Sequence, residues 1–376
     1  MQIYAERWNS LCSPSLTYTD SRMNLGLTRS ESEIHTRFWG LGSSRDISDL
    51  LEVKHSVLMF HVFKFPSGKK YTIFTVPKKS GGVREIRAPV SEIKIIQQKL
   101  NLVLRIVFKP HLCVHGFRLN KSIVSNAEEH SSKKYVLNVD LQDFFPSINF
   151  ARVFGMFKAY PYNFKREVAT VLARICCDEF EFPQGAPTSP IISNMICAKL
   201  DSQLKKLALI LKCRYSRYGD DLTFSTSREP FPYELASHIA SGATVGVKVG
   251  GRLEALINNN GFVVNYKKVR LQKSSYRQEV TGLIVNRGPN VSRPFRRQIR
   301  AMLHAWEKYG LLNAEAIYLT TFRQKYRSPF KPLPQFEHVV RGKIEFLGMV
   351  RGKADPTYQK YVAQYNLLQA SSPRSP

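Results

Sequence analysis

The sequence has few cysteines, no long apolar run and a shortage of acidic residues. Its six cysteines show no CxxC spacing, which argues against a zinc site or a disulfide framework and favours reduced, buried thiols. No apolar run approaches the roughly 18 residues that a membrane span requires. The N-terminal stretch MQIYAERWNSLC has an acid and no apolar core, which is not the pattern of a signal peptide. These absences predict a cytoplasmic protein with no membrane partner.

Positive charge is what the chain has in excess. It carries 56 Lys and Arg against 29 Asp and Glu over 376 residues, a formal net charge of +27. Residues 1–50 hold five basic and six acidic side chains, whereas sixteen basic and five acidic side chains follow from residue 283 onward. An excess of this kind usually serves a polyanionic partner. The length suggests two or three units or one large multi-lobed domain.

Hydrophobic patterning predicts a mixture of strands and helices. Strands are expected at 57–65 and 71–76, joined through PSGKK as a hairpin, then after the basic loop within 77–90, and at the start of 134–148. Helices are expected at 92–107, 149–160, 164–176, 187–212 and 293–309. The Ser- and Thr-rich residues 1–50 are expected to form a partly helical appendage, and the end SSPRSP a frayed terminus.

Two adjacent aspartates, Asp220 and Asp221, lie in RYGDDLTFST between segments typical of strands, where Gly219 and Asp220 predict a hairpin turn. Asp140 ends the apolar run 136–139, which predicts a buried strand. If that strand lies beside the hairpin, three carboxylates converge, and a divalent cation would relieve their repulsion. Oxygen ligation suits Mg²⁺, and two such ions stabilise attacking and leaving oxygens in phosphoryl transfer. Taken singly, each aspartate could instead belong to a solvated turn or a helix cap.

The order and separation of several motifs resemble those of reverse transcriptases. VDLQDFFPSI (139–148), QGAPTSPIISN (184–194) and YGDD (218–221) resemble the palm motifs, and KKSGGVREIRAP (78–89) resembles the basic fingers motif that precedes them. NNGFVVNYKKVR resembles the lysine-bearing motif that follows. SNAEEH (125–130), preceded by HGFRLNKSI, fits the NAxxH signature of bacterial retron reverse transcriptases, and VTG (280–282) fits their triplet near the thumb. The resemblance covers roughly residues 50 to 300.

The sequence departs from the retron pattern in three places. Retrons more often have YADD, whereas Gly219 gives YGDD, a form shared with viral RNA-dependent RNA polymerases. The segment after YGDD is long, and 241–251 resembles an inserted hairpin. Residues 1–50 match no part of the family pattern.

The resemblance implies roles for the acidic and aromatic residues. Asp140 and Asp220 would bind two Mg²⁺ ions with the backbone carbonyl of Leu141, and Asp221 would support or join them. Phe145 would lie beneath the incoming sugar and exclude a 2′-hydroxyl by steric overlap. Packing of Phe144 and Phe145 in the core is the alternative for this aromatic pair.

Other residues are expected to hold the nucleotide. By resemblance, Gln184 and Gly185 would cradle the nucleotide and the template base, because glycine permits close backbone approach. Arg84, with Lys79 and Arg87, would bind triphosphate oxygens, since a guanidinium suits them. A plain helix-entry loop and a solvated basic turn are the alternatives. Lys267 or Lys268 would act on the pyrophosphate leaving group; Lys267 is the first candidate, but the residues do not decide between them.

A third set is expected to bind or position RNA. The resemblance assigns Asn126 and His130 to positioning RNA or the fingers, and places Val280, Thr281 and Gly282 near bound RNA. For the last three, ordinary strand-to-turn structure is the alternative. The basic thumb would grip an A-form duplex through phosphates and 2′-hydroxyls, with RNA-binding residues at Arg296, Arg297 and Arg300.

The implied fold is α+β, the right hand of a polymerase. Its expected divisions are an N-terminal appendage (1–50), fingers (51–130), a palm (131–285, with part of the fingers at 150–185) and a thumb (286–376).

The resemblance further implies an RNA-directed DNA polymerase that copies part of its own structured non-coding RNA, the template and primer, into RNA-linked single-stranded DNA. Its partners would be that RNA, the RNA–DNA hybrid and single-stranded DNA product, dNTPs and a separate effector protein in anti-phage defence. None of this follows from composition or spacing.

Several other functions remain open. A group II intron maturase or another defence-associated reverse transcriptase shares the palm, but maturases usually carry a larger C-terminal domain, and NAEEH and VTG argue against one. An RNA-dependent RNA polymerase would explain YGDD but would not be expected to keep the bulky Phe145. A catalytically inert RNA-binding protein would not need to retain Asp140, Asp220 and Asp221.

Overall fold

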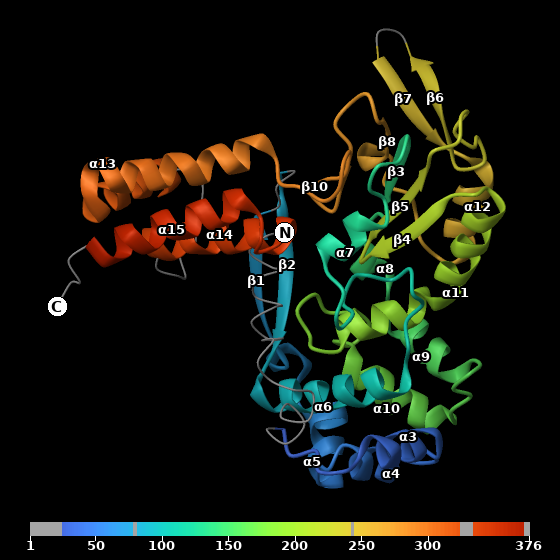
Figure 1. Ribbon diagram of the computed structural model, residues 1–376. Helices are drawn as coiled ribbons and strands as arrows, with labels where there is room; N and C mark the ends of the chain where they lie inside the picture. Colours follow the sequence, from blue (N-terminus) through green and yellow to red (C-terminus); the bar gives the residue numbers. More distant parts are fainter. Residues whose placement is uncertain (1–24, 78–80, 242–243, 324–333, 372–376) are drawn as a thin grey trace.

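A four-stranded antiparallel sheet lies at the centre of the structure, a computed structural model that describes residues 25–77, 81–241, 244–323 and 334–371 (Figure 1). The strand order is β4–β5–β3–β8. The strands are β3 (Tyr135–Asp140), β4 (Arg214–Tyr218), β5 (Asp221–Thr226) and β8 (Arg270–Lys273). Side chains alternate between the two faces of a strand, so Leu137 and Val139 point to one face of β3, and Asn138 and Asp140 to the other. The sheet therefore has one apolar and one polar face.

Helices cover the apolar face of the sheet. Helix α11 (Ser189–Ile210) packs on it and contacts α12 (Gly251–Asn259). Leu222 and Phe224 of β5 are fully buried in one core cluster with Leu200 and Leu204 of α11. The predicted long helix at 187–212 is confirmed, and Pro190 lies in its first turn, where a missing N–H costs nothing.

The segment before the sheet contains one wrong prediction. The apolar run 57–65, expected to be a strand, forms helix α5 (His55–Met59) and a π-helical turn (Phe60–Lys64). A short apolar run does not reveal its period, and here Leu58 and Val62 face the core at helical spacing. The strand β1 (Tyr71–Pro77) pairs with β2 (Val83–Pro89) instead, forming a ribbon that rises from the helices below it.

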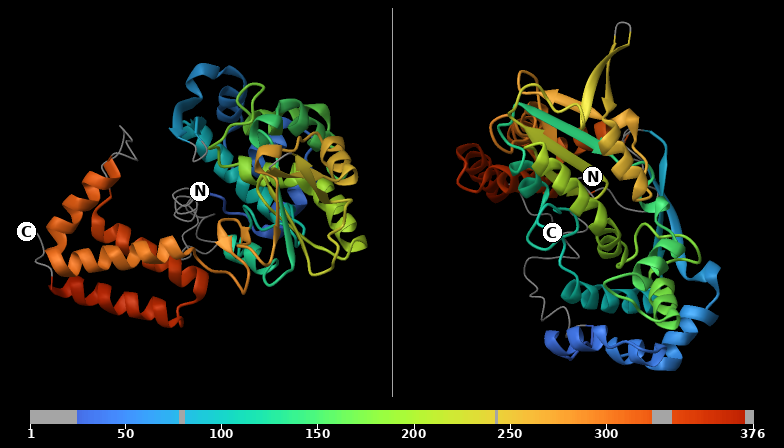
Figure 2. Two further views of the ribbon diagram at one scale, coloured as in Figure 1. Left: turned by 90° about the horizontal axis from the view of Figure 1, so that it is seen from above. Right: turned by 90° about the vertical axis from the view of Figure 1, so that its right-hand side faces the viewer.

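Helices and short elements complete the main body. They are α6 (Ser91–Val107), α7 (Ile123–Glu128), α8 (Phe144–Ser147), α9 (Phe150–Lys158) and α10 (Arg166–Cys176), with 3₁₀ turns at Ser67–Lys69 and Tyr266–Lys268. The predicted helices at 92–107, 149–160 and 164–176 are thus confirmed. Strands β6 (Ala236–Ser241) and β7 (Thr244–Val249) form the hairpin expected near 241–251, which projects from the body in Figure 1 and in the right-hand view of Figure 2.

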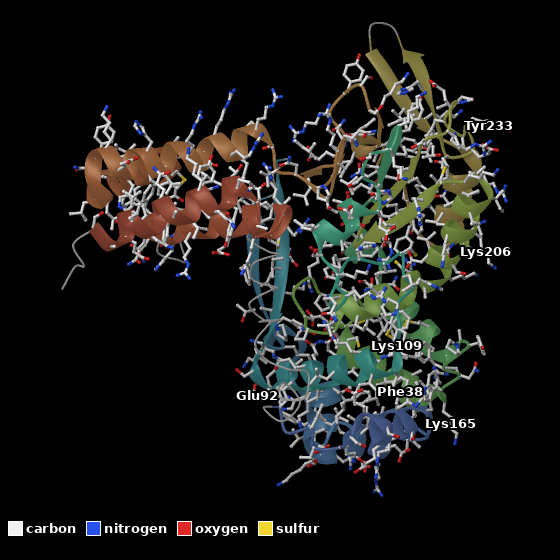
Figure 3. The ribbon with its side chains drawn as sticks, in the orientation of Figure 1. Phe38, Glu92, Lys109, Lys165, Lys206 and Tyr233 are labelled. Atoms are coloured by element: carbon white, nitrogen blue, oxygen red, sulfur yellow. The ribbon has the colours of Figure 1, made fainter. Side chains whose placement is uncertain are left out.

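Residues 31–50 pack into the main core. They form α3 (Glu31–Trp39) and α4 (Ser44–Leu50), as the expectation of partial helicity required. Phe38, labelled in Figure 3, is fully buried. Its ring meets that of Phe164 edge-on, with the ring centroids 5.2 Å apart. This part of the expected appendage is therefore integral to the folded body. Residues 1–24 lie outside the described residues.

Three helices form an arm beside the main body (Figure 2). They are α13 (Arg293–Arg323), α14 (Phe336–Arg351) and α15 (Pro356–Ser371). Trp306, Phe336 and Tyr365 lie in a second buried cluster that is shared by all three helices. The helix predicted at 293–309 is confirmed. It ends at that point because Gly310 takes a left-handed φ of 76° and breaks α13. Of the SSPRSP end, Ser371 is the last residue of α15, and residues 372–376 lie outside the described residues.

Two further observations bear on the expectations from composition. No helix in the described part of the chain is long and apolar enough to cross a membrane. The five described cysteines are unpaired, and four of them are buried. The short strands β9 (Glu279–Val280) and β10 (Leu283–Ile284) join the body to the arm.

Candidate active site

The structure brings together the three aspartates that the sequence singled out. Strands β3 and β5 pair in a register that places Asp140 directly opposite Asp221. Asp220 occupies the turn between β4 and β5, and its carbonyl accepts a hydrogen bond from the N–H of Leu141 at 3.1 Å. The backbone at Leu141 therefore lies beside the acidic turn, as the expected ligand set requires.

Burial, together with neighbouring carboxylates, raises the pKa of Asp220 and of Asp221. Burial, followed by the negative charges of Asp220 and Asp140, raises the pKa of Asp221 to about 7. Burial and the charge of Asp140 likewise raise the pKa of Asp220. Asp220 and Asp221 are both half-buried by accessible area. Their raised pKa values therefore come from the dense protein around the carboxylates and do not require that the groups be sealed from solvent. The cluster is unfavourable when all three groups are ionised without a cation.

Two neighbouring side chains already bind Asp140. Lys268 Nζ lies 2.9 Å from Oδ2, and Asn265 Nδ2 donates to Oδ1 at 2.9 Å. No group of three His, Cys, Asp or Glu side chains within the described ranges has the closed arrangement of a metal site. The donor set nevertheless fits a hard divalent cation, because its donors are carboxylate oxygens, and the pKa values of Asp220 and Asp221 are raised by burial and then by repulsion between the carboxylates.

The structure distinguishes the two candidate lysines. Both lie on the 3₁₀ turn Tyr266–Lys268, but Lys268 forms the ion pair with Asp140. The pKa of Lys268 is raised. Burial lowers this pKa, but the hydrogen bond to Asp140 and the negative charge of Asp140 raise it by more. Both lysines are exposed, so the ion pair with Asp140 rather than burial distinguishes them. The structure therefore favours Lys268 over Lys267, and the action of Lys268 on the pyrophosphate stays a prediction.

The adjacent phenylalanines have different environments. Phe144 is 3% exposed and stacks on Phe262 with ring centroids 5.5 Å apart. Phe145 is half-buried and lies near the rings of Phe182, at 6.1 Å, and Phe117, at 6.3 Å. Phe144 is thus the core residue of the pair, which leaves Phe145 as the candidate gate.

The loop that opens α11 packs against strand β2. The N–H of Arg87 donates to the carbonyl of Gln184 at 2.9 Å. Gly185 has a φ of +126°, and a Cβ there would approach the Arg87 carbonyl and an Ile86 methyl group to 3.0 Å. Only glycine fits this close approach, so the motif holds the β1–β2 ribbon against the body.

The basic residues of that ribbon divide into two groups. Arg87 forms ion pairs with Asp178 at 3.0 Å and Glu181 at 2.6 Å, which occupy its guanidinium; triphosphate binding by Arg87 stays a prediction that these pairs disfavour. Arg84 is exposed. The pKa of Asp220 is raised mainly by burial, and the positive charge of Arg84 lowers it in part. Arg84 therefore acts on the acidic cluster electrostatically. Lys79 lies outside the described residues.

Two residues assigned to RNA binding are buried. Asn126 and His130 are both 0% exposed, so the prediction of direct RNA binding through these side chains is wrong, whereas the expectation that they position RNA or the fingers stays a prediction. Val280 is also 0% exposed and packs in the second core cluster, which excludes contact through its side chain. Thr281 and Gly282, with φ of 48° and 83°, form the two-residue turn between β9 and β10. RNA contact by Thr281 and Gly282 stays a prediction.

The arginines of the arm lie near the start of α13. Arg297 and Arg300 are exposed, whereas Arg296 is half-buried. Positions 293, 297 and 300 share a helix face, and each carries an exposed arginine. This face is a candidate phosphate-binding surface.

Sequence reasoning missed a buried ion pair behind the acidic turn. Arg217 of β4 is 0% exposed and binds Asp201 of α11. Its Nη1 donates to the carbonyl of Gly219 at 3.1 Å, and its Nη2 to Oδ1 of Asn194 at 3.0 Å. The available signal was an arginine within a segment typical of a strand.

Comparisons with known proteins agree with these motifs. A family model described as "Reverse transcriptase (RNA-dependent DNA polymerase)" matches residues 76–286. Retron Mx65 reverse transcriptase of Myxococcus xanthus is 34% identical over 284 residues, which cover 70% of this chain and 62% of that protein. Retron Ec86 reverse transcriptase of Escherichia coli is 32% identical over 271 residues, which cover 70% of this chain and 79% of that protein.

Among solved structures, a telomerase from Candida albicans aligns over 79% of this chain and 63% of its own, with a TM-score of 0.42 and 10% identity. The α+β architecture, with Asp140 and Asp221 paired at one end of the central sheet, agrees with the matched family. The chain spans less than two thirds of the first relative's length. By the family match and by its identity to these relatives, the chain belongs to the reverse transcriptases and, within them, to the retron type.

Proposed function

We propose that this protein is the RNA-directed DNA polymerase of a retron, which copies part of a structured non-coding RNA into RNA-linked single-stranded DNA. The observation that carries the proposal is the register of β3 and β5, which sets Asp140 opposite Asp221 beside the Asp220 turn. In a chain of this family, three carboxylates at that position support nucleotidyl transfer.

The acidic residues would hold the catalytic ions. Asp140, Asp220 and the backbone carbonyl of Leu141 would bind two Mg²⁺, with Asp221 in support. When bound, these ions would stabilise the charge that develops as the primer terminus attacks the α-phosphate in line. Asp140 would exchange its contact with Lys268 for this ligation, which frees the ammonium group for the pyrophosphate leaving group.

Other residues would select and orient the substrate. Arg84 is the described cation of β2 available to the triphosphate, since Arg87 is held by Asp178 and Glu181. Phe145 would exclude the 2′-hydroxyl, with Phe144 fixed behind it against Phe262. Gln184 and Gly185 would support the nucleotide and the template base through the contact with β2.

The partners follow from charge and family. The net charge of +27 suits an RNA template-primer and an RNA–DNA hybrid, which Arg297 and Arg300 of the arm would bind through phosphates. Single-stranded DNA, dNTPs and a separate effector protein in anti-phage defence complete the proposed set, with the cytoplasm as the site of action.

Primer extension by the full chain tests the proposal. With an RNA template, a DNA primer, dNTPs and Mg²⁺, the wild type should extend the primer, and Asp220→Asn should lose at least about a thousandfold in rate. Asp143→Asn is the matched control, because Asp143 lies in the same motif but is exposed and has a left-handed φ that asparagine tolerates. A wild type that incorporates no dNTP, or an Asp220→Asn variant with wild-type rate, would contradict the proposal.

An RNA-dependent RNA polymerase is a second candidate only because of YGDD. The structure offers another reason for that glycine: Gly219 has a φ of +65°, which favours glycine whatever polymer is made. The preference for dGTP over GTP on one primer–template separates the two functions.

A further inference from the structure

The sheet face that carries Asp140 and Asp221 continues as a buried polar surface. Asn138 pairs with Thr223 on the neighbouring strand, and Thr223 pairs with Ser216 on the next. Ser225 follows two residues after Thr223 and therefore points to the same face. All four of these polar side chains are at most 8% exposed. Polar side chains buried in this way need partners within the protein.

The partners for the two serines come from helix α7 and the residues just after it. His130 Nδ1 lies 2.7 Å from Ser225 Oγ, and Nε2 lies 2.7 Å from Ser216 Oγ. Ser216 Oγ donates in turn to Asn126 Oδ1 at 2.7 Å. We call these four residues the serine–histidine chain. It joins α7 to β4 and β5, the two strands that flank the acidic turn.

The serine–histidine chain is uncharged and closed to solvent. Asn126, His130, Ser216 and Ser225 are each 0% exposed. Burial, followed by nearby positive charges, lowers the pKa of His130 to about 3, so the imidazole is neutral at physiological pH. A neutral ring that bonds through both nitrogens fixes two strands at once but offers nothing to a phosphate.

Helix α7 also contacts the turn at Thr281 and the core of the arm. Thr281 Oγ1 donates to the carbonyl of Ile123, the first residue of α7, at 3.1 Å. Ala127 is fully buried in the same cluster as Val280, Leu283 and Leu303 of α13. One short helix therefore touches the strands of the acidic turn and the base of the arm that would hold the duplex.

We infer that the serine–histidine chain is a positioning device for DNA synthesis: it fixes the β4–β5 hairpin that carries Asp220 and Asp221, and through α7 it sets that hairpin relative to the base of the arm. The inference rests on the proposed polymerase function and adds residues that touch neither substrate nor metal. In-line transfer depends on placement, and an error near 1 Å can cost on the order of a hundredfold in rate.

Serine-to-alanine variants of the full chain test this inference, because each removes one hydroxyl and little volume. Ser216→Ala and Ser225→Ala should each lower kcat for dNTP incorporation by roughly tenfold and raise the Mg²⁺ concentration for half-maximal rate severalfold. The dissociation constant for the RNA and its salt dependence should stay within about twofold of wild type, because the serine–histidine chain does not reach the surface.

Two controls separate positioning from loss of stability. Ser48→Ala removes a buried hydroxyl that bonds the carbonyl of Arg45 within α4, remote from the sheet. It should lower the melting temperature by a similar amount but leave kcat and the Mg²⁺ requirement unchanged. Ser225→Thr keeps a hydroxyl and should recover most of the rate that Ser225→Ala loses.

The outcomes are distinct. If both alanine variants keep kcat and the Mg²⁺ requirement within twofold of wild type, the inference is overturned. Weaker RNA binding with unchanged kcat would overturn it too, in favour of an RNA-contact role. If Ser216→Ala does not fold, kcat and the Mg²⁺ requirement of Ser225→Ala and Ser225→Thr still test the inference. An inactive wild type would refute the proposed function instead, because the inference is scored only as a change from an active parent.

Discussion

The guanidinium of Arg217 donates two hydrogen bonds to the carboxylate of Asp201, at 2.8 and 2.7 Å, and neither side chain is more than 1% exposed. The pair joins β4 to α11 directly behind the acidic turn, and Arg217 also donates to the carbonyl of Gly219. The turn therefore has support on both faces of the sheet: this ion pair on the apolar face, and the serine–histidine chain on the polar face.

Removing one partner of this pair should be strongly destabilising. Asp201→Asn leaves the Arg217 charge buried without its counter-ion, which should cost about 3–5 kcal/mol of unfolding free energy. Asp49→Asn is the control, since Asp49 is 52% exposed in its pairs with Arg29 and Arg37 and should cost at most about 1 kcal/mol. Urea unfolding of both variants measures the difference; equal costs would refute the argument.

The raised pKa of Asp221 predicts opposite pH effects on stability and on metal binding. The folded state binds a proton at Asp221 below about pH 7, whereas the unfolded chain binds it only below about 4. Without metal, this group should therefore destabilise the protein above pH 7, and the penalty should fall as the pH drops from 7 toward 4. The Mg²⁺ requirement should rise up to about tenfold per pH unit below 7, because the ion competes with that proton.

Melting in EDTA between pH 6 and 8 checks the first effect. Asp221→Asn should be more stable than wild type at pH 8, and the gap should narrow at pH 6. A gap that does not depend on pH would show that Asp221 ionises normally.

Phe145→Ala should admit ribonucleotides. Removing the ring opens space for a 2′-hydroxyl, so discrimination between dGTP and GTP should fall by one or two decades, about 1.4–2.7 kcal/mol of activation free energy. kcat/KM for each nucleotide on one primer–template measures this. Phe144→Ala serves as the control: Phe144 is buried against Phe262, so its loss should reduce stability more than selectivity. Unchanged discrimination in an active Phe145→Ala enzyme would locate the gate elsewhere.

The two lysines of the Tyr266–Lys268 turn form a matched pair. Lys268→Gln should reduce kcat by at least about tenfold, because it removes the ammonium group that lies 2.9 Å from Asp140. Lys267→Gln, at an exposed neighbouring position, should stay within about twofold of wild type. A larger loss of kcat in Lys267→Gln than in Lys268→Gln would indicate that Lys267 is the functional lysine.

RNA binding should weaken steeply with salt, because protein cations that neutralise phosphates release counterions. Arg297→Gln with Arg300→Gln should reduce the slope of log K against log[salt] by up to about 0.9 for each duplex phosphate that is no longer neutralised. Arg296→Gln should change it less, because Arg296 is half-buried. Lys109→Gln with Lys165→Gln is the charge-matched control; these exposed lysines lie on the body and not on the arm (Figure 3). An equal decrease of slope in the control would mean that total charge, not the α13 face, binds RNA.

The sequence by itself determined the parts whose cause is local. Helices such as 187–212 and 92–107 follow from apolar spacing and from Pro190 at a start. The strand ending at Asp140 and the turn at Gly219 follow from an apolar run and a turn signal. The acidic cluster could be predicted because the residue types and their order along the chain are characteristic of one chemistry.

Tertiary structure alone decided what depends on partners far apart in the chain. The run 57–65 became helical because packing of Leu58 and Val62, not local pattern, chose its period. Lys268 rather than Lys267 reaches Asp140, 128 residues earlier, because the turn's orientation selects one of two adjacent side chains. His130 could be taken for an RNA contact until its serines, 86 and 95 residues away, were seen to enclose it. Burial and hydrogen-bond partners are set by how distant segments meet, and one sequence read along its length does not contain those distances.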